Sequence, residues 1–220
     1  IDWTRVKADF AIIRAGYGRE ISQKDKKFDI NYAGAKAAGI PCGAYWCSYA
    51  QSEEEARTEA AVCLEIIKGK QFEYPIYFDV EEQRTLKLGV DKVSAIINAF
   101  LRELENAGYF AGLYMSAYPL KNYVNDTTRR RYAVWVAHYG VSKPDYNGQY
   151  GMWQKSSSGR VEGINGNVDL DECYVDYPAI IKNKGDNGYP KPEPPKPQKA
   201  KIKATIEIDE HIYSGLLEEQ

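Results

Sequence analysis

The sequence predicts an α/β fold, an irregular (β/α) barrel of the TIM type with few helices in its second half. Three observations support this. Apolar runs alternate with segments of helical periodicity in the first half, and such alternation gives parallel strands joined by right-handed crossovers. The apolar runs are hydrophobic on both faces, as in a sheet that is covered on both sides. The second half keeps the strands, but its linking segments lack helical periodicity.

The first strand–helix–strand unit is read from two apolar runs and a glycine. FAIIRAGYG (10–18) is predicted as a buried strand that ends in glycines. The next segment, about 26–38, is predicted as a helix that ends at Gly39, because glycine is the usual residue after a helix end. PCGAYWCSYA (41–50) is the second predicted strand.

The second helix has the clearest start of any element. Ser52 is followed three residues later by Glu55, which is a capping-box pattern, and the helix is expected to end at Gly69. The third strand follows as YPIYFDVEE (74–82).

The third helix is expected from Asp91 to Gly108, and the fourth strand over 110–117. The helix has an apolar set that keeps the 3.6-residue period, namely Val93, Ile96, Ile97, Phe100, Leu101 and Leu104. The later strands are expected over 133–140, 150–156 and 167–174, with links rich in Gly, Ser, Asn and Pro. A barrel of this type closes at eight strands, so the seven predicted strands are one short.

The composition excludes several classes of function. The formal net charge of −2 leaves no basic footprint for nucleic acid, and no apolar run is long enough to span a membrane. His138 and His211 are the only histidines, so a multi-histidine metal site is excluded, and no metal or cofactor is expected. His138 is interpreted as a core or rim residue rather than a catalytic base. The four cysteines are expected to be free thiols.

The composition changes near residue 183. We predict a barrel domain over 1–182 and an extended linker rich in Pro and Lys over 183–200. The tail, 201–220, alternates like a strand, and its end from residue 214 could begin a helix. This tail is expected to be the stump of a second module or an association element through which an oligomer could form.

A pair of acids at the end of the third predicted strand is the strongest local signal for chemistry. Alternation places Asp79 and Glu81 on one face, with Cα atoms about 6.5–7 Å apart. Two carboxylates in a partly desolvated pocket should raise one pKa, giving a general acid beside a charged carboxylate. Protonation of a glycosidic oxygen requires such a pair. The alternative is a strand that simply ends in solvated acids.

Seven ordered segments resemble one family, the glycoside hydrolase family 25 muramidases of bacteria and phages. They are IDWTRVKADFAIIRAGYG, GIPCGAYWCSYA, PIYFDVE, AGLYMSA, VWVAHYG, MWQ and GINGNVDLD. The resemblance covers about residues 1–180. It implies a flattened barrel of eight strands whose last strands lack intervening helices. It also implies that the family's first strand, reading approximately Gly-Ile-Asp-Val-Ser, is missing here together with its site aspartate.

The resemblance implies cleavage of the β-1,4 bond between N-acetylmuramic acid and N-acetylglucosamine in peptidoglycan. Glu81 matches the general acid, and Asp79 matches an aspartate that supports the acid or orients the 2-acetamido group. Asp169 matches an acidic site residue, whereas Asp171 lies where the family often has Asn and is not carried over. Substrate-binding residues are expected to be Arg14, Tyr45, Tyr114, Trp135, Tyr139 and Trp153.

Several alternatives stay open at this stage. The chain could be a truncated form of an active muramidase, a catalytically impaired wall-binding remnant, or a chitin-directed glycosidase that shares the D-x-E pattern. Catalysis could invert the configuration, or it could retain it through the substrate's acetamido group, which we favour slightly. Peptidoglycan glycan strands are the expected partner. The expected location is extracellular or at the cell wall, reached by secretion or by holin-dependent release, although no signal peptide is visible.

Overall fold

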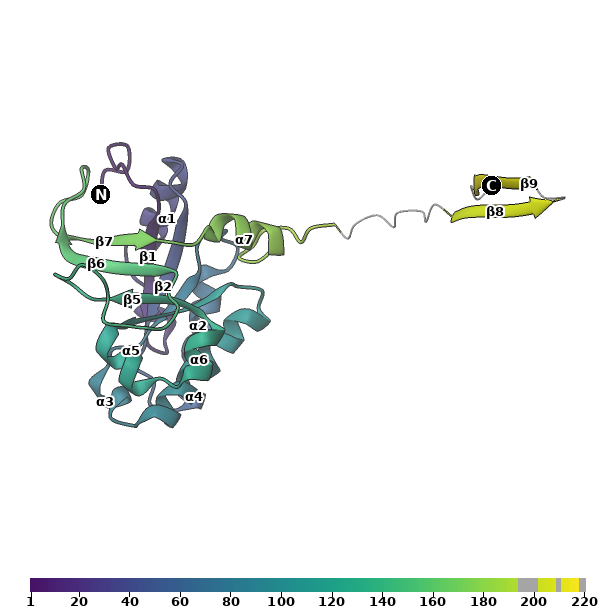
Figure 1. Cartoon of the computed structure of the whole chain (residues 1–220). Coiled ribbons are helices and arrows are strands. Elements are labelled where there is room, and N and C mark those ends of the chain that lie inside the picture. The colour runs from purple at the N-terminus through teal and green to yellow at the C-terminus, as the bar shows by residue number, and fades with distance from the viewer. Residues whose placement is uncertain (194–201, 209–210, 218–220) are drawn as a thin grey trace.

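A computed structural model describes residues 1–193, together with the backbone of 202–208 and 211–217. Its main feature is a curled seven-stranded sheet with helices on its outer face (Figure 1). The strands follow one another in the sheet in chain order. They are β1 (Ala11–Tyr17), β2 (Cys42–Cys47), β3 (Ile76–Asp79), β4 (Ala111–Ser116), β5 (Ala133–Ala137), β6 (Met152–Gly159) and β7 (Val168–Cys173). The predicted α/β class and the count of seven strands are confirmed.

The last strand runs against the others. β1 to β6 pair in parallel, whereas β6 and β7 are antiparallel. The link between β6 and β7 is too short for the crossover that a parallel pair needs, so the chain returns as a hairpin. β7 therefore runs in the opposite direction to the other strands. Its first residues lie beside the carboxyl end of β6.

The three predicted helices are confirmed as α1 (Phe28–Ala37), α2 (Glu53–Ile67) and α4 (Val90–Asn106). The Ser52 hydroxyl accepts a hydrogen bond from the backbone N–H of Glu55 at 3.2 Å, as the capping pattern predicted. Further short helices were not predicted: η1 (Ile21–Gln23), α3 (Gln83–Leu86), α5 (Ala117–Tyr123), α6 (Asp126–Arg131) and α7 (Tyr177–Lys184). The described second half has few helices, as predicted, and these contain only about two turns each, which is too short to show a period.

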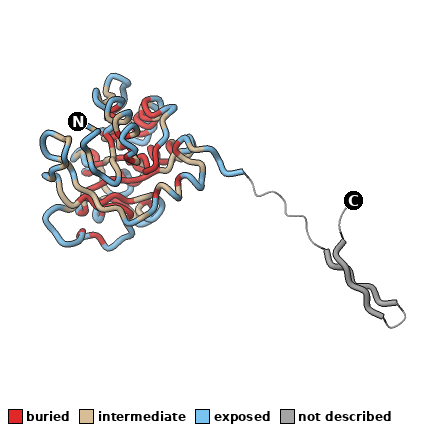
Figure 2. The backbone as a smooth tube through the Cα atoms, turned by 90° about the horizontal axis from the view of Figure 1, so that it is seen from above, coloured by how far each residue is buried: buried red, intermediate tan, exposed pale blue. Residues whose placement is uncertain are grey.

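Both faces of the central strands β2 to β5 are largely buried, as their apolar sequences predicted (Figure 2). On the outer face, Phe78 of β3 stacks on Phe100 of α4 with ring centroids 3.8 Å apart. On the inner face, Tyr77, Tyr114 and Trp135 form an aromatic cluster. A Cβ at Gly112 would lie 2.4 Å from the Tyr77 ring, so only glycine fits there. Tyr114 and Trp135 of this cluster also line the cavity described below.

The sheet is open between its two edge strands. In the part of the chain that the structure describes, β1 and β7 pair with no strand on their outer edges. Loops approach each other across this seam: the Asp2 N–H donates to the Gly163 carbonyl at 2.8 Å, and Arg5 pairs with Glu162 at 2.8 Å. Because no strand precedes β1 among the described residues, two neighbouring edges are unpaired and the seam lies between them.

Residues beyond 182 still belong to the packed domain. Asn187 is fully buried, and its amide nitrogen donates to the carbonyls of Phe72 at 3.2 Å and Tyr74 at 2.8 Å. Its side-chain oxygen accepts from the Phe110 N–H at 2.7 Å. The Tyr189 hydroxyl also contacts Glu73. We therefore propose that the linker begins after Tyr189.

We predict that Asn187→Ala lowers the free energy of unfolding by about 2–4 kcal/mol. The substitution leaves the Phe110 N–H and two carbonyls buried without their partners. Asn187→Gly is the matched variant, because it removes the same bonds and suits the positive φ of 54° at this position. Urea unfolding should show both variants destabilised, and an unchanged midpoint for both would contradict the role given to Asn187.

The tail forms a hairpin of β8 (Ile202–Ile208) and β9 (His211–Leu217), paired antiparallel. The predicted strand character is confirmed. The prediction of a helix from residue 214 is wrong for Ser214–Leu217, because these residues pair with β8. Residues 194–200 of the predicted linker, and residue 201 of the predicted tail, lie outside the described residues. The described helices include none that is long and apolar enough to cross a membrane.

Candidate functional site

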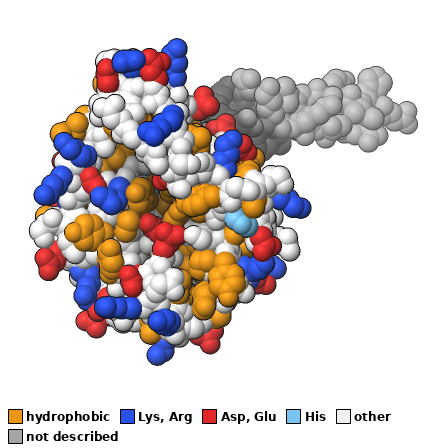
Figure 3. All heavy atoms as spheres, turned by 90° about the vertical axis from the view of Figure 1, so that its left-hand side faces the viewer, with side chains coloured by type: hydrophobic (Ala, Val, Ile, Leu, Met, Phe, Trp, Pro, Cys, Tyr) orange, Lys and Arg blue, Asp and Glu red, His pale blue; other side chains and the backbone are white. Residues whose placement is uncertain are grey.

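A cavity of about 650 Å³ opens at the carboxyl ends of the parallel strands and continues down the seam between β1 and β7. In Figure 3, acidic side chains lie among hydrophobic ones on this side of the molecule. The residues that line the cavity include most of those predicted from the sequence, namely Arg14, Tyr45, Asp79, Glu81, Tyr114, Trp135, Tyr139 and Asp169. Gln154 and Asp171 also line it. The carboxyl ends of parallel strands are where barrel proteins build their sites.

Asp79 is the last residue of β3 and is largely enclosed. The Cys47 thiol of β2 donates a hydrogen bond to Asp79 Oδ2 at 3.3 Å. Burial, and next the nearby charge of Glu81, raise the pKa of Asp79 to about 7. The sequence argument predicted a raised pKa in this pair, and the raised pKa of Asp79 agrees with it. The role of Glu81 as general acid, which the family resemblance implies, stays a prediction.

Glu81 stands at the mouth of the cavity. It is solvent-exposed, and its Oε1 accepts a hydrogen bond from the Ser116 hydroxyl at 2.7 Å. Ser116 ends β4, the strand next to β3, so the two strand ends meet at this bond. Glu81 is therefore positioned by its neighbour while its other oxygen stays accessible from the cavity.

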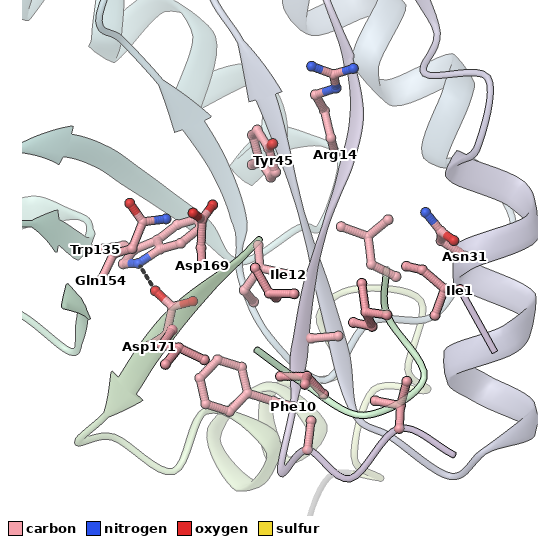
Figure 4. A pocket seen from close by; sticks show the side chains of 18 of the residues that line it. Ile1, Phe10, Ile12, Arg14, Asn31, Tyr45, Trp135, Gln154, Asp169 and Asp171 are labelled. Atoms are coloured by element: carbon pink, nitrogen blue, oxygen red, sulfur yellow. Dashed lines mark hydrogen bonds between the residues drawn. The ribbon is translucent and has the colours of Figure 1, made fainter. Parts of the chain in front are cut away.

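A second acid pair comes from β7 (Figure 4). Asp171 lies deeper than Asp169 and accepts a hydrogen bond from the Trp135 indole N–H at 2.7 Å. Burial raises the pKa of Asp171 to about 7, and the charge of Asp169 adds to the rise. Burial also raises the pKa of Asp169. Although the family resemblance left Asp171 out, the structure places it in the same cavity.

Aromatic side chains form the wall of the cavity between the two acid pairs. Trp135 packs on Tyr114 with ring centroids 4.4 Å apart and meets the edge of Tyr45 at 6.2 Å. The hydroxyls of Tyr114 and Tyr139 both donate to Gln154 Oε1, the first at 2.8 Å. Trp135 and Tyr114 are almost fully buried, so Tyr45 and Tyr139 offer most of the accessible ring surface.

Arg14 and Trp153 have a different environment from the one expected, whereas His138 lies at the rim, as expected. Arg14 lines the cavity but is held by Asp25, with Nε 2.7 Å from Oδ2, so it holds none of the four cavity acids. Trp153 is buried on the outer face and donates to the His138 carbonyl at 2.9 Å, so it does not line the cavity. His138 Nδ1 accepts from the Asp145 N–H at 3.0 Å, which is a rim position.

The sequence analysis missed three polar residues of the site: Cys47, Ser116 and Gln154. Side chains alternate between the two faces of a strand, so Cys47 is predicted on the same face as Tyr45. By the same rule Gln154 and Trp153 of β6 point to opposite faces. No such signal identifies Ser116 as the partner of Glu81, because that contact depends on two strand ends far apart in sequence. Cys42, Cys47, Cys63 and Cys173 are all free, as predicted.

No group of three or more His, Cys, Asp or Glu side chains that could hold a metal ion occurs in the described part of the chain. The cavity offers carboxylates, phenols, indoles, amides and the Arg14 guanidinium. Such groups can exchange protons and bind sugars by hydrogen bonds and stacking.

A curled (β/α) sheet with carboxylates at its strand ends is an arrangement that glycoside hydrolases use. The family described as "Glycosyl hydrolases family 25" matches residues 1–164, and the chain belongs to this family. The resemblance noted in the sequence is thereby confirmed.

The chain is similar to several characterised proteins. It is 32% identical to the autolytic lysozyme of Clostridium acetobutylicum, over 78% of this chain and 52% of that protein. The CTP1L endolysin structure matches with a TM-score of 0.69 and 28% identity, over 79% of this chain and 60% of that one. The lysozyme of Streptomyces coelicolor has the same fold, with a TM-score of 0.69 and 24% identity over 86% of this chain and 92% of that one. The chain thus spans about half the length of the autolytic lysozyme.

Proposed function

We propose that this chain is a peptidoglycan hydrolase that cleaves the β-1,4 bond between N-acetylmuramic acid and N-acetylglucosamine. The observation that carries the proposal is the meeting of two carboxylate pairs, Asp79 with Glu81 and Asp169 with Asp171, in one open cavity. Membership of glycosyl hydrolase family 25 and similarity to proteins named lysozyme and endolysin support it.

Glu81 is proposed as the general acid. It is accessible from the cavity and fixed by Ser116, so it can donate a proton to the glycosidic oxygen as the bond to the sugar C1 breaks. Once the leaving sugar has departed, the Glu81 carboxylate can take a proton from the incoming water.

Asp79 is proposed to act on the substrate's 2-acetamido group. As a carboxylate it would accept the acetamido N–H, which makes the carbonyl oxygen a better nucleophile toward C1. The bond from this oxygen to C1 forms as the glycosidic bond breaks, and water later opens the cyclic intermediate with retention of configuration. Asp169 and Asp171 lie on the opposite wall and are proposed to orient the sugar rings, together with Tyr45, Tyr114, Trp135 and Tyr139.

Ser116→Ala should lower kcat by about tenfold, because Glu81 loses the one side-chain hydrogen bond that positions it. KM should change little, since Ser116 acts through Glu81 rather than on the sugar. Ser116→Thr keeps a hydroxyl and is the matched control. Steady-state kinetics on soluble peptidoglycan fragments measures both constants. Equal rates for Ser116→Ala and the unmodified chain would show that the bond has no positioning role.

Turbidity loss of purified bacterial walls, measured beside release of sugars from chitin oligomers, tests the proposal. Lysis of walls by the full 220-residue chain is expected. Activity on chitin alone would replace the substrate with chitin, and wall binding without any cleavage would favour a wall-binding protein. Neither alternative is favoured by the relatives, whose names are lysozyme, autolysin and endolysin.

The proposed partner is the glycan strand of peptidoglycan, and the proposed place of action is the cell wall or the space outside the cell. Because the chemistry uses carboxylates and the substrate's own acetamido group, it requires no cofactor. Association through residues 201–220 stays a prediction, and size-exclusion chromatography with light scattering would measure it.

A further inference from the structure

We propose that Tyr17 and Tyr49 form an aromatic platform that binds a sugar ring of the glycan beyond the cleavage site. This inference rests on the proposed function, because the ligand is the glycan chain proposed to bind in the cavity. We call this pair the Tyr17–Tyr49 platform. It lies outside the cavity residues already described and was not singled out in the sequence.

The strand register places the platform beside the acid pair. Tyr17 is opposite Cys47 in the β1–β2 ladder, and Cys47 is opposite Asp79 in the β2–β3 ladder. Paired residues point to the same face, so Tyr17 lies on the face that carries the Cys47–Asp79 hydrogen bond. Two strand spacings separate Tyr17 from Asp79, or about 10 Å. That distance is comparable to the length of a disaccharide.

The two rings are available to a ligand. Tyr17 is 39% exposed and Tyr49 is 50% exposed, and both count among the exposed large hydrophobic residues. Their ring centroids are 5.8 Å apart, and the rings meet at 70°. Two rings at this angle form a corner in which the C–H face of a sugar can stack on one ring while its hydroxyls reach the phenol oxygens.

The backbone under the platform is fixed on both sides. Next to Tyr17, the Gly18 N–H donates to the Cys47 carbonyl at 3.1 Å, and the Gly18 carbonyl accepts from the Trp46 indole at 3.2 Å. The Tyr49 N–H donates to the buried carboxyl of Glu59 at 2.8 Å. A backbone that is already held in place loses little freedom when a ligand binds, which favours affinity.

The surrounding charges favour a neutral ligand. Arg19, two residues after Tyr17, pairs with Glu55 at 2.5 Å. Their charges compensate, so the platform offers ring faces and hydroxyls rather than a free charge. A neutral sugar ring that continues the chain bound at Asp79 and Glu81 is the occupant that fits these features.

The test compares glycan fragments of increasing length as substrates for the full chain. Two variants are tested, Tyr49→Ala and the double variant Tyr17→Ala/Tyr49→Ala. In each, kcat/KM for long fragments should fall by about tenfold more than kcat/KM for the shortest fragment that is cleaved. Tyr49→Phe keeps the ring and should retain most of the preference for length. An equal loss on short and long fragments would overturn the proposal.

Tyr174→Ala is the matched control. Tyr174 is 54% exposed and makes a comparable pair with Tyr150, with centroids 5.7 Å apart at 77°. It follows the end of β7, at the opposite end of the sheet from Asp79. The length preference should be unchanged in Tyr174→Ala, and a matching loss there would show a general surface effect.

A binding measurement separates this inference from the proposed function. In Glu81→Gln, calorimetry with a long soluble glycan should give a Kd that Tyr49→Ala raises by about tenfold. If the unmodified chain cleaves no glycan but this change in Kd is found, the catalytic proposal fails and the platform stands. If cleavage occurs but Tyr49→Ala leaves the Kd unchanged, the platform fails alone.

Discussion

Glu81→Gln should lower kcat on peptidoglycan by about a hundredfold to ten-thousandfold, the usual contribution of a general acid. The amide has nearly the shape of the carboxyl and can still accept the Ser116 hydrogen bond, but it has no acidic proton to give to the leaving oxygen. Substrate affinity should change far less than kcat. The rate of release of reducing sugars from soluble peptidoglycan measures the effect.

The control for this variant is Glu65→Gln. Glu65 is an exposed carboxylate on α2, paired with Lys68 on the outer surface. The Glu65→Gln substitution removes one negative charge, as Glu81→Gln does, but lies outside the cavity. Its kcat on peptidoglycan should therefore match that of the unmodified chain. Near-normal lysis by Glu81→Gln would show that another residue supplies the proton, and the assignment of Glu81 would fail.

Asp79→Asn should also lower kcat/KM by about a hundredfold or more at neutral pH, because the amide cannot accept the acetamido N–H as a carboxylate does. The pKa of about 7 gives a second signature. Below pH 7 the free chain carries a neutral Asp79, so kcat/KM should fall as the pH falls through 7. The residual activity of Asp79→Asn should lack this step. If the unmodified chain and Asp79→Asn showed the same fall of kcat/KM near pH 7, a group other than Asp79 would be responsible for it.

The stability of Asp79→Asn separates lost chemistry from lost folding. The folded pKa of Asp79 is raised from 3.8 to about 7, so the folded state binds a proton that the unfolded chain releases between these values. This contribution to stability is complete below pH 3.8 and is lost as the pH rises through 7. The variant should therefore gain stability relative to the unmodified chain as the pH rises. A large destabilisation at pH 8 would mean that its low activity reflects unfolding.

Most of the fold could be predicted because long elements carry repeated signals. The Ser52 cap and the apolar stripe from Val93 to Leu104 each combine several residues that agree. The short helices α5 and α6 escaped because each contains no more than two turns. The antiparallel direction of β7 also escaped, since an apolar strand pattern is the same in either direction.

The site residues were likewise predictable only where the sequence carries a clear signal. Asp79, Glu81 and Asp169 were found because acids at the ends of buried strands are unusual and because the family motif contains them. Trp153 was expected among the sugar-binding residues because it lies on β6 next to Gln154. Side chains alternate along a strand, however, so Gln154 faces the cavity and Trp153 faces the outer core. The raised pKa of Asp79 depends mainly on its burial at the end of β3, and sequence spacing does not show how deeply a side chain is buried.

Identification of the new reducing end tests the central claim most directly. Purified peptidoglycan is digested with the 220-residue chain, the products are reduced with borohydride, and the reduced sugar is identified by mass spectrometry. Cleavage by the proposed carboxylate chemistry predicts reduced N-acetylmuramic acid, and its loss in Glu81→Gln. Reduced N-acetylglucosamine, or products that persist in Glu81→Gln, would contradict it.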